Sequence, residues 1–258
     1  MREITTIYWS SSLRDPSPPD QWYLKDPEPV KNYFVNNIPE NKDNTDMGFF
    51  GCPAAGAFFK NLYTFKANKN DSATFPAGYL KTVANQSIGS IGDFGNKVTL
   101  RQSRKSAIDG YIDLIYDINY VMFADKPLTI RWSTPNYPPS APSPGAMLIS
   151  GEFDIGRWYR PAVLNWFVPT DNTRFEIKEG DDLFYFQALT DDKIVFQKFM
   201  MTDQIRELAQ SFLKSLKRDG MGLTLEERYQ IAEGRQSQES ILAEIKKNLI
   251  TTPYDHNT

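Results

Sequence analysis

The sequence predicts a mainly β protein of the α+β class, with an antiparallel β-sandwich or jelly-roll-like core and a C-terminal helical appendage. Aromatic residues make up 14% of the 258 residues, and such side chains fit the pleated, half-buried surface of a sheet. The segment Pro144–Phe199 is the densest run of strand-forming residues, and we expect the fold to be built around it. We therefore expect a β-rich domain over residues 1–200, with a proline-rich N-terminal arm, and a helical tail over residues 201–258.

Strand-forming runs recur throughout the predicted β domain, because β-branched and aromatic residues cluster between turn-forming ones. The predicted strands are Glu3–Trp9, Asn61–Ala67, Tyr111–Phe123, Leu128–Ser133, Ala146–Phe153, Val163–Val168 and Leu183–Ala188, with Arg174–Ile177 as a further candidate. Between the first two, the segment Ser10–Pro39 contains repeated prolines, which remove backbone donors and disfavour helix. It also carries Trp22 and Tyr23, so we expect it to wrap the core as an ordered arm.

The spacing of apolar residues changes to three and four after Thr202, which is typical of helices. Thr202 is the expected cap of the first helix, and Thr224 with Glu227 forms a capping box that opens a second helix, ending at about Ala232. A third helix is expected to begin at Ser237 or Ser240. The apolar stripes must be buried against the β domain or against another subunit. The second alternative makes four residues the predicted oligomer contacts: Phe212, Leu216, Ile241 and Ile245.

Composition excludes several classes of function. The formal net charge is -3 and the pI is about 5.4, whereas nonspecific nucleic-acid binding needs a surplus of Lys and Arg. We therefore do not expect nucleic acid as a partner. The N-terminal residues contain no apolar signal-peptide core, and no window approaches the ~18 uninterrupted apolar residues of a membrane helix. We expect neither a signal peptide nor a membrane partner.

The chain has one cysteine, Cys52, and one histidine, His256. These two residues cannot supply the ligands of a Cys/His zinc site or the two histidines of a facial-triad iron centre. A nucleophile activated by histidine would require the C-terminal residues to fold back into a site. Cys52 has no neighbouring cation in sequence that would lower its pKa, so we interpret it as a small buried residue. We expect no cofactor and name no catalytic residue.

Two groups of residues that include acids are candidate binding sites. Asp109, Asp113 and Asp117 are four apart, and three carboxylates on one surface are a candidate site for Mg²⁺. We favour solvent-facing acids on an amphipathic strand, because such alternation needs no function. The second group lies at the start of the dense β stretch and is the predicted binding surface. It consists of Glu152, Asp154, Arg157, Trp158 and Tyr159.

Part of the dense β stretch resembles a family of uncharacterised proteins encoded by tailed, T4-like bacteriophages, including cyanophages. The residues that carry the resemblance are Gly151-Glu-Phe-Asp154, Trp158, Asn165-Trp-Phe167, Arg174–Asp181 and Leu183-Phe-Tyr-Phe186, with Gly51-Cys-Pro-Ala54 and Lys60-Asn61 upstream. The sequence departs from the pattern at Asp182, where the family usually has proline. The resemblance implies a phage origin and a β-sandwich-like core, and it implies no catalytic residues.

These observations favour a noncatalytic phage protein that acts through protein–protein contacts as a virion component, an assembly factor or a host-directed accessory protein. Its expected partners are other subunits of a homo-oligomer or virion proteins, and its expected location is the host cytoplasm or the virion. One alternative is a Mg²⁺-dependent nucleotide hydrolase of the dUTPase-like type, suggested by Ala107–Tyr111 and Glu179–Asp181. Another is a glycan-binding or glycan-cleaving β domain that uses its tryptophans as stacking platforms.

Overall fold

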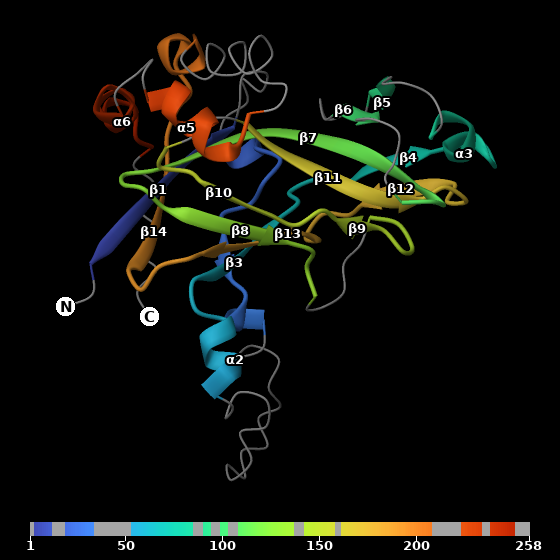
Figure 1. Ribbon diagram of the computed structural model, residues 1–258, viewed down its shortest axis with the longest axis horizontal. Helices are drawn as coiled ribbons and strands as arrows, with labels where there is room; N and C mark the ends of the chain where they lie inside the picture. Colours follow the sequence, from blue (N-terminus) through green and yellow to red (C-terminus); the bar gives the residue numbers. More distant parts are fainter. Residues whose placement is uncertain are drawn as a thin grey trace.

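The structure is a computed structural model, and it describes residues 3–11, 19–33, 53–84, 90–93, 99–102, 108–136, 142–157, 161–207, 223–233 and 238–250. The described part is mainly β, with a few short helices around two sheets, as the sequence predicts (Figure 1).

The larger sheet has seven strands, of which the 14-residue β7 is the centre. The strands are β1 (Ile4–Ser11), β5 (Ser90–Asp93), β6 (Thr99–Gln102), β7 (Tyr111–Ala124), β9 (Met147–Leu148), β11 (Pro161–Pro169) and β14 (Lys193–Lys198). The main path runs β14, β1, β7, β11, β9, and β6 joins β5 to β7. Strands β1 and β14 pair in parallel, unlike the antiparallel pairs expected from the sequence. A parallel pair needs a long crossover connection, and the part of the β domain between these two strands supplies it.

The smaller sheet has five strands in the order β10, β8, β13, β3, β2, and a separate ribbon pairs β12 with β4. The strands are β2 (Glu28–Pro29), β3 (Leu62–Lys66), β4 (Asp71–Thr74), β8 (Thr129–Ser133), β10 (Gly151–Asp154), β12 (Arg174–Ile177) and β13 (Asp182–Ala188). All seven predicted strands and the further candidate are found at about their expected places, except that Ala146–Phe153 is divided between two strands.

The division of Ala146–Phe153 is a correction to the sequence prediction. Its first part, β9, pairs with β11 in the larger sheet, whereas its second part, β10, pairs with β8 in the smaller sheet. The chain changes sheets after Ile149, whose amide still donates to the carbonyl of Asn165 at 2.7 Å. Gly151 then passes close to Trp132, where a Cβ atom would lie 3.2 Å from the indole nitrogen. Ser150 and Gly151 separate the two parts, and strand propensity does not reveal that the parts join different sheets.

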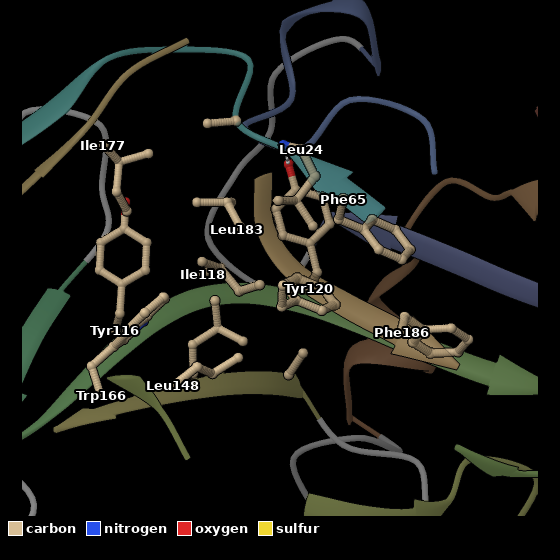
Figure 2. Packing of buried hydrophobic residues seen from close by; sticks show 14 of the residues in the cluster. Leu24, Phe65, Tyr116, Ile118, Tyr120, Leu148, Trp166, Ile177, Leu183 and Phe186 are labelled. Atoms are coloured by element: carbon tan, nitrogen blue, oxygen red, sulfur yellow. Dashed lines mark hydrogen bonds between the residues drawn. The ribbon is translucent and has the colours of Figure 1, made fainter. Parts of the chain in front are cut away.

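The two sheets pack face to face over one hydrophobic core and form an open sandwich (Figure 1). Phe65 of β3 stacks on Phe184 with ring centroids 5.0 Å apart, and it meets Trp9 of β1 edge to face at 5.8 Å. Figure 2 shows Phe65 and Phe186 of the smaller sheet beside Tyr120 of the larger one. Interdigitated aromatic rings from both inner faces therefore join the sheets.

The described part of the N-terminal arm, residues 19–33, lies against the core as predicted. It contains the short helix η1 (Pro19–Gln21) and strand β2. Trp22 and Tyr23 are both buried, and Leu24 forms a bridge with Ala67. The amide of Leu24 also donates to the hydroxyl of Tyr120 at 3.0 Å, which ties the arm to the larger sheet (Figure 2). The arm is thus part of the core and not a linker.

Two short helices and strands β2, β4, β5 and β14 are absent from the sequence prediction. Helix α2 (Pro53–Phe58) lies in a glycine-containing segment, and helix α3 (Tyr79–Val83) follows Gly78, which has a positive φ of 75°. Proline suits the first position of a helix, because its missing N–H would have no helical partner there. With only 6 and 5 residues, neither helix shows enough apolar periodicity to be recognised.

The capping predictions in the C-terminal third are confirmed. The amide of Ile205 donates to Thr202 Oγ1 at 3.1 Å. In helix α5 (Leu225–Glu233), the Thr224 amide donates to the Glu227 carboxylate at 2.6 Å, and the Glu227 amide donates back to Thr224 Oγ1 at 3.3 Å. Within the described residues, no helix is long and apolar enough to cross a membrane.

Helix α6 (Gln238–Lys247) packs on the outer face of the larger sheet, and this corrects the predicted role of two of its residues. Ile241 and Ile245 are buried in a cluster with side chains from β1, β7 and the segment after β14. They fill the subunit's own core and offer no surface to a second subunit. The other two predicted oligomer contacts, Phe212 and Leu216, lie outside the described residues, as do Cys52 and His256.

Candidate functional site

The predicted binding surface maps to the turn that follows β10, where the turn faces helix α5. The side chain of Asp154 organises this turn, because its Oδ1 accepts hydrogen bonds from the amides of Leu128, Gly156 and Arg157 at 2.9, 2.8 and 3.2 Å. A carboxylate that accepts three backbone amides holds the turn and joins it to the start of β8. Asp154 is therefore a structural residue.

Arg157 is the centre of an ion-pair cluster with helix α5. Its guanidinium donates two hydrogen bonds to Glu226, both 2.9 Å long, and two to Glu233, at 2.6 and 3.3 Å. The same group lies 4.8 Å from the ring centroid of Tyr229. Glu226 and Glu233 are seven residues apart, so two turns of helix bring both to one face. The Arg157 charge lowers the pKa of Glu226, chiefly through their hydrogen bond.

Glu152 is also engaged within the chain, because its carboxylate accepts a hydrogen bond of 2.7 Å from the side chain of Arg131 across the β10–β8 pair. Trp158 and Tyr159 lie outside the described residues. The structure therefore brings Glu152, Asp154 and Arg157 together, but their polar atoms bind other parts of the chain. Asp154 and Arg157 belong to a junction between this turn and helix α5, and the use of this surface for binding stays a prediction.

The sequence prediction missed a buried polar cluster between the sheets. Tyr116 of β7 donates a hydrogen bond of 2.8 Å to the Asp71 carboxylate of β4. The Tyr116 hydroxyl has one proton, so it accepts from the hydroxyl of Tyr23, 2.5 Å away. All three residues are buried. The hydrogen bonds join the arm, the larger sheet and the two-stranded ribbon, and no sequence spacing predicts this grouping.

Burial changes the titration of this cluster. It is the main cause of the raised pKa of the Asp71 carboxyl, and the hydrogen bond from Tyr116 opposes it. Burial also raises the pKa of both tyrosines. The phenols therefore keep their protons at neutral pH, so Tyr116 donates to Asp71 and Tyr23 donates to Tyr116. The hydrogen bond from Tyr116 offsets only part of the cost of burying the Asp71 carboxylate.

The raised pKa of Asp71 predicts a pH effect on stability. The folded state holds the Asp71 proton more tightly than the unfolded state, so this residue contributes stability below about pH 4 that is lost as pH rises through the folded pKa. We expect the stability of the Asp71→Asn variant relative to wild type to increase from pH 4 to pH 7. Urea unfolding at several pH values in this range measures the free energy of unfolding of both proteins. A difference in this free energy that does not change with pH would contradict the prediction.

Two of the three aspartates considered for Mg²⁺, Asp109 and Asp113, differ in exposure. Asp109 is exposed in the turn before β7, whereas Asp113 is only 4% exposed within the strand. The expectation of a solvent-facing acid is therefore wrong for Asp113. For Asp117 the side chain is not among those described. Within the described ranges, no group of three or more His, Cys, Asp or Glu residues is placed to hold a metal ion.

Helix α2 is the element that projects furthest from the two sheets (Figure 1). One side of it is fixed by a small cluster in which Ala55 and Phe59 pack against Val30, Leu62 and Tyr185. Phe58 does not belong to this cluster, and 44% of its surface is exposed. Its ring contacts the ring of Phe59 edge to face. Phe58 is a candidate contact for another protein, because aromatic side chains are enriched in the cores of protein–protein interfaces.

Comparisons with known proteins supply no further assignment. No protein-family model, no curated protein and no solved structure matches the chain.

Proposed function

We propose that the protein is a noncatalytic protein of a tailed phage that acts through contacts with other protein subunits, as a virion component, an assembly factor or a host-directed accessory protein. The phage origin follows from the sequence resemblance. The observation that carries the contact function is the exposure of Phe58 on helix α2, whose opposite side is fixed to the body by Ala55 and Phe59.

The charged side chains of the candidate site support this proposal, because each of them binds another group of the same chain. Arg157 binds two glutamates of helix α5, Asp154 holds a turn, and Glu152 pairs with Arg131. Arg157 is needed at the junction between the smaller sheet and helix α5, whereas Glu152 links strands β10 and β8. The exposed aromatic residue on α2 has no comparable structural task. Aromatic side chains are also enriched in the cores of protein–protein interfaces.

A photo-cross-linking amino acid in place of Phe58 tests the contact function during infection. We expect light to produce a defined cross-linked species that contains this protein and a second polypeptide, identified by mass spectrometry. The control places the same amino acid at Met147, which is 43% exposed on strand β9. Absence of a species specific to position 58 would contradict the proposed surface.

Mass spectrometry of purified virions separates the structural role from the accessory roles, because a virion component remains in the particles. Hydrolysis of a nucleotide by the purified protein with Mg²⁺ would instead contradict a noncatalytic function. A rise in melting temperature with Mg²⁺ would point in the same direction, since a ligand that binds only the folded state stabilises it.

A further inference from the structure

Helix α5 is attached to the protein in a different way from helix α6. Helix α6 inserts Ile241 and Ile245 into a hydrophobic cluster on the larger sheet. Helix α5 contributes no described side chain to any of the three hydrophobic clusters, and its one buried hydrophobic residue is Tyr229. The described contacts that hold α5 are therefore mainly polar.

These contacts converge on the turn after strand β10. Arg157 binds Glu226 and Glu233 on successive turns of α5, and it lies over the ring of Tyr229. The hydroxyl of Tyr229 in turn accepts a hydrogen bond of 2.6 Å from the amide of Asp154. One arginine and one tyrosine thus make the described attachment of the helix.

The Asp154 amide lies on the outer edge of the smaller sheet. Strand β10 is the last strand of that sheet, and the following amide, of Ile155, donates inward to Leu128. Neighbouring amides of a strand point to opposite sides, so the Asp154 amide points away from β8. Tyr229 satisfies a backbone donor that would otherwise face solvent at an open sheet edge.

We propose that helix α5 is an ionic latch over the outer edge of β10, which opens without unfolding the sandwich. The carboxylates of Glu226 and Glu233 are 57% and 49% exposed in the closed state. Ion pairs at such exposure are weak and are screened by salt. Opening breaks contacts at Arg157 and Tyr229 but leaves all three hydrophobic clusters intact. It exposes the Asp154 amide, which is the kind of group that an incoming strand uses.

Amide hydrogen exchange measured by NMR tests the latch at about 0.05 M and about 1 M sodium chloride. We expect exchange of the α5 amides and of the Asp154 amide to become about tenfold faster at high salt, because screening weakens the ion pairs. Exchange in α6 and β11 should change little, since hydrophobic packing holds these elements. Their amides also report whether each protein is folded.

The double variant Glu226→Gln/Glu233→Gln should show fast exchange in α5 already at low salt, with little further response to salt. Glu239→Gln is the matched control, because Glu239 is an exposed acid on helix α6. It should behave as wild type. The latch is refuted if α5 exchanges only together with α6 and β11 in wild type, or if the double variant retains wild-type exchange in α5.

Discussion

Replacing Gly156 with alanine is expected to destabilise the protein by about 3 kcal/mol or more, as overpacking against a rigid backbone does. A Cβ atom at this position would lie 2.1 Å from the carbonyl oxygen of Lys126 and 2.8 Å from the Cα atom of Pro127. These are backbone atoms, so no rotamer change relieves the clash. Urea unfolding of the purified variant measures the loss of free energy of unfolding.

The loss at Gly156 should be large because the opposing turn cannot move freely. Lys126 binds both Glu3 and Asp192 at 2.8 Å, and the amide of Leu128 donates to Asp154. The control is Gly56→Ala in helix α2, where a Cβ atom would meet nothing within 4 Å. Alanine there should stabilise by about 0.5–1 kcal/mol, because glycine is a poor helix former. A Gly156→Ala variant as stable as wild type would show that the two turns are not in the described contact.

Truncating Phe65 to alanine should cost about 3–5 kcal/mol, the usual loss for a buried aromatic residue. Phe65 is fully buried between the sheets, and its ring contacts Trp9 of the larger sheet and Phe184 of its own sheet. It also lies 6.0 Å from the ring of Phe196 on β14. Removal of the ring leaves a cavity where the inner faces of the two sheets meet. Chemical denaturation measures the resulting loss of free energy of unfolding.

The matched control for Phe65 is Phe58→Ala, which removes the same atoms from an exposed position on helix α2. Its only described ring contact is with Phe59, so we expect a loss of less than about 1 kcal/mol. Comparable losses for the two variants would contradict the assignment of Phe65 to the centre of the core. The same control also separates folding from binding, because Phe58→Ala should weaken the proposed subunit contact while leaving the protein folded.

The candidate site was only partly predictable from the sequence. Glu152, Asp154 and Arg157 are close in the chain, and their charges mark the segment as a place where polar contacts concentrate. Their partners are distant: Glu226 and Glu233 lie 69 and 76 residues beyond Arg157. Asp154 and Arg157, two residues of the predicted binding surface, contact a helix of the same chain. Asp71 and Tyr116 are likewise separated by 45 residues, and neither lies in a recognisable motif.

The sequence by itself determined most of the longer strands and the helix starts, because strand propensity and side-chain capping are local interactions. Strand propensity located the strands from β1 to β13 that carry long apolar or aromatic runs, and side-chain caps located the helix starts at Thr202 and Thr224. These features depend on residues within a few positions of one another. Only the tertiary structure decided that β1 pairs with β14, that Ala146–Phe153 is divided between two sheets, and that Ile241 and Ile245 face the sheet. Each of these outcomes depends on which distant surface buries a given side chain, and chain spacing does not encode that choice.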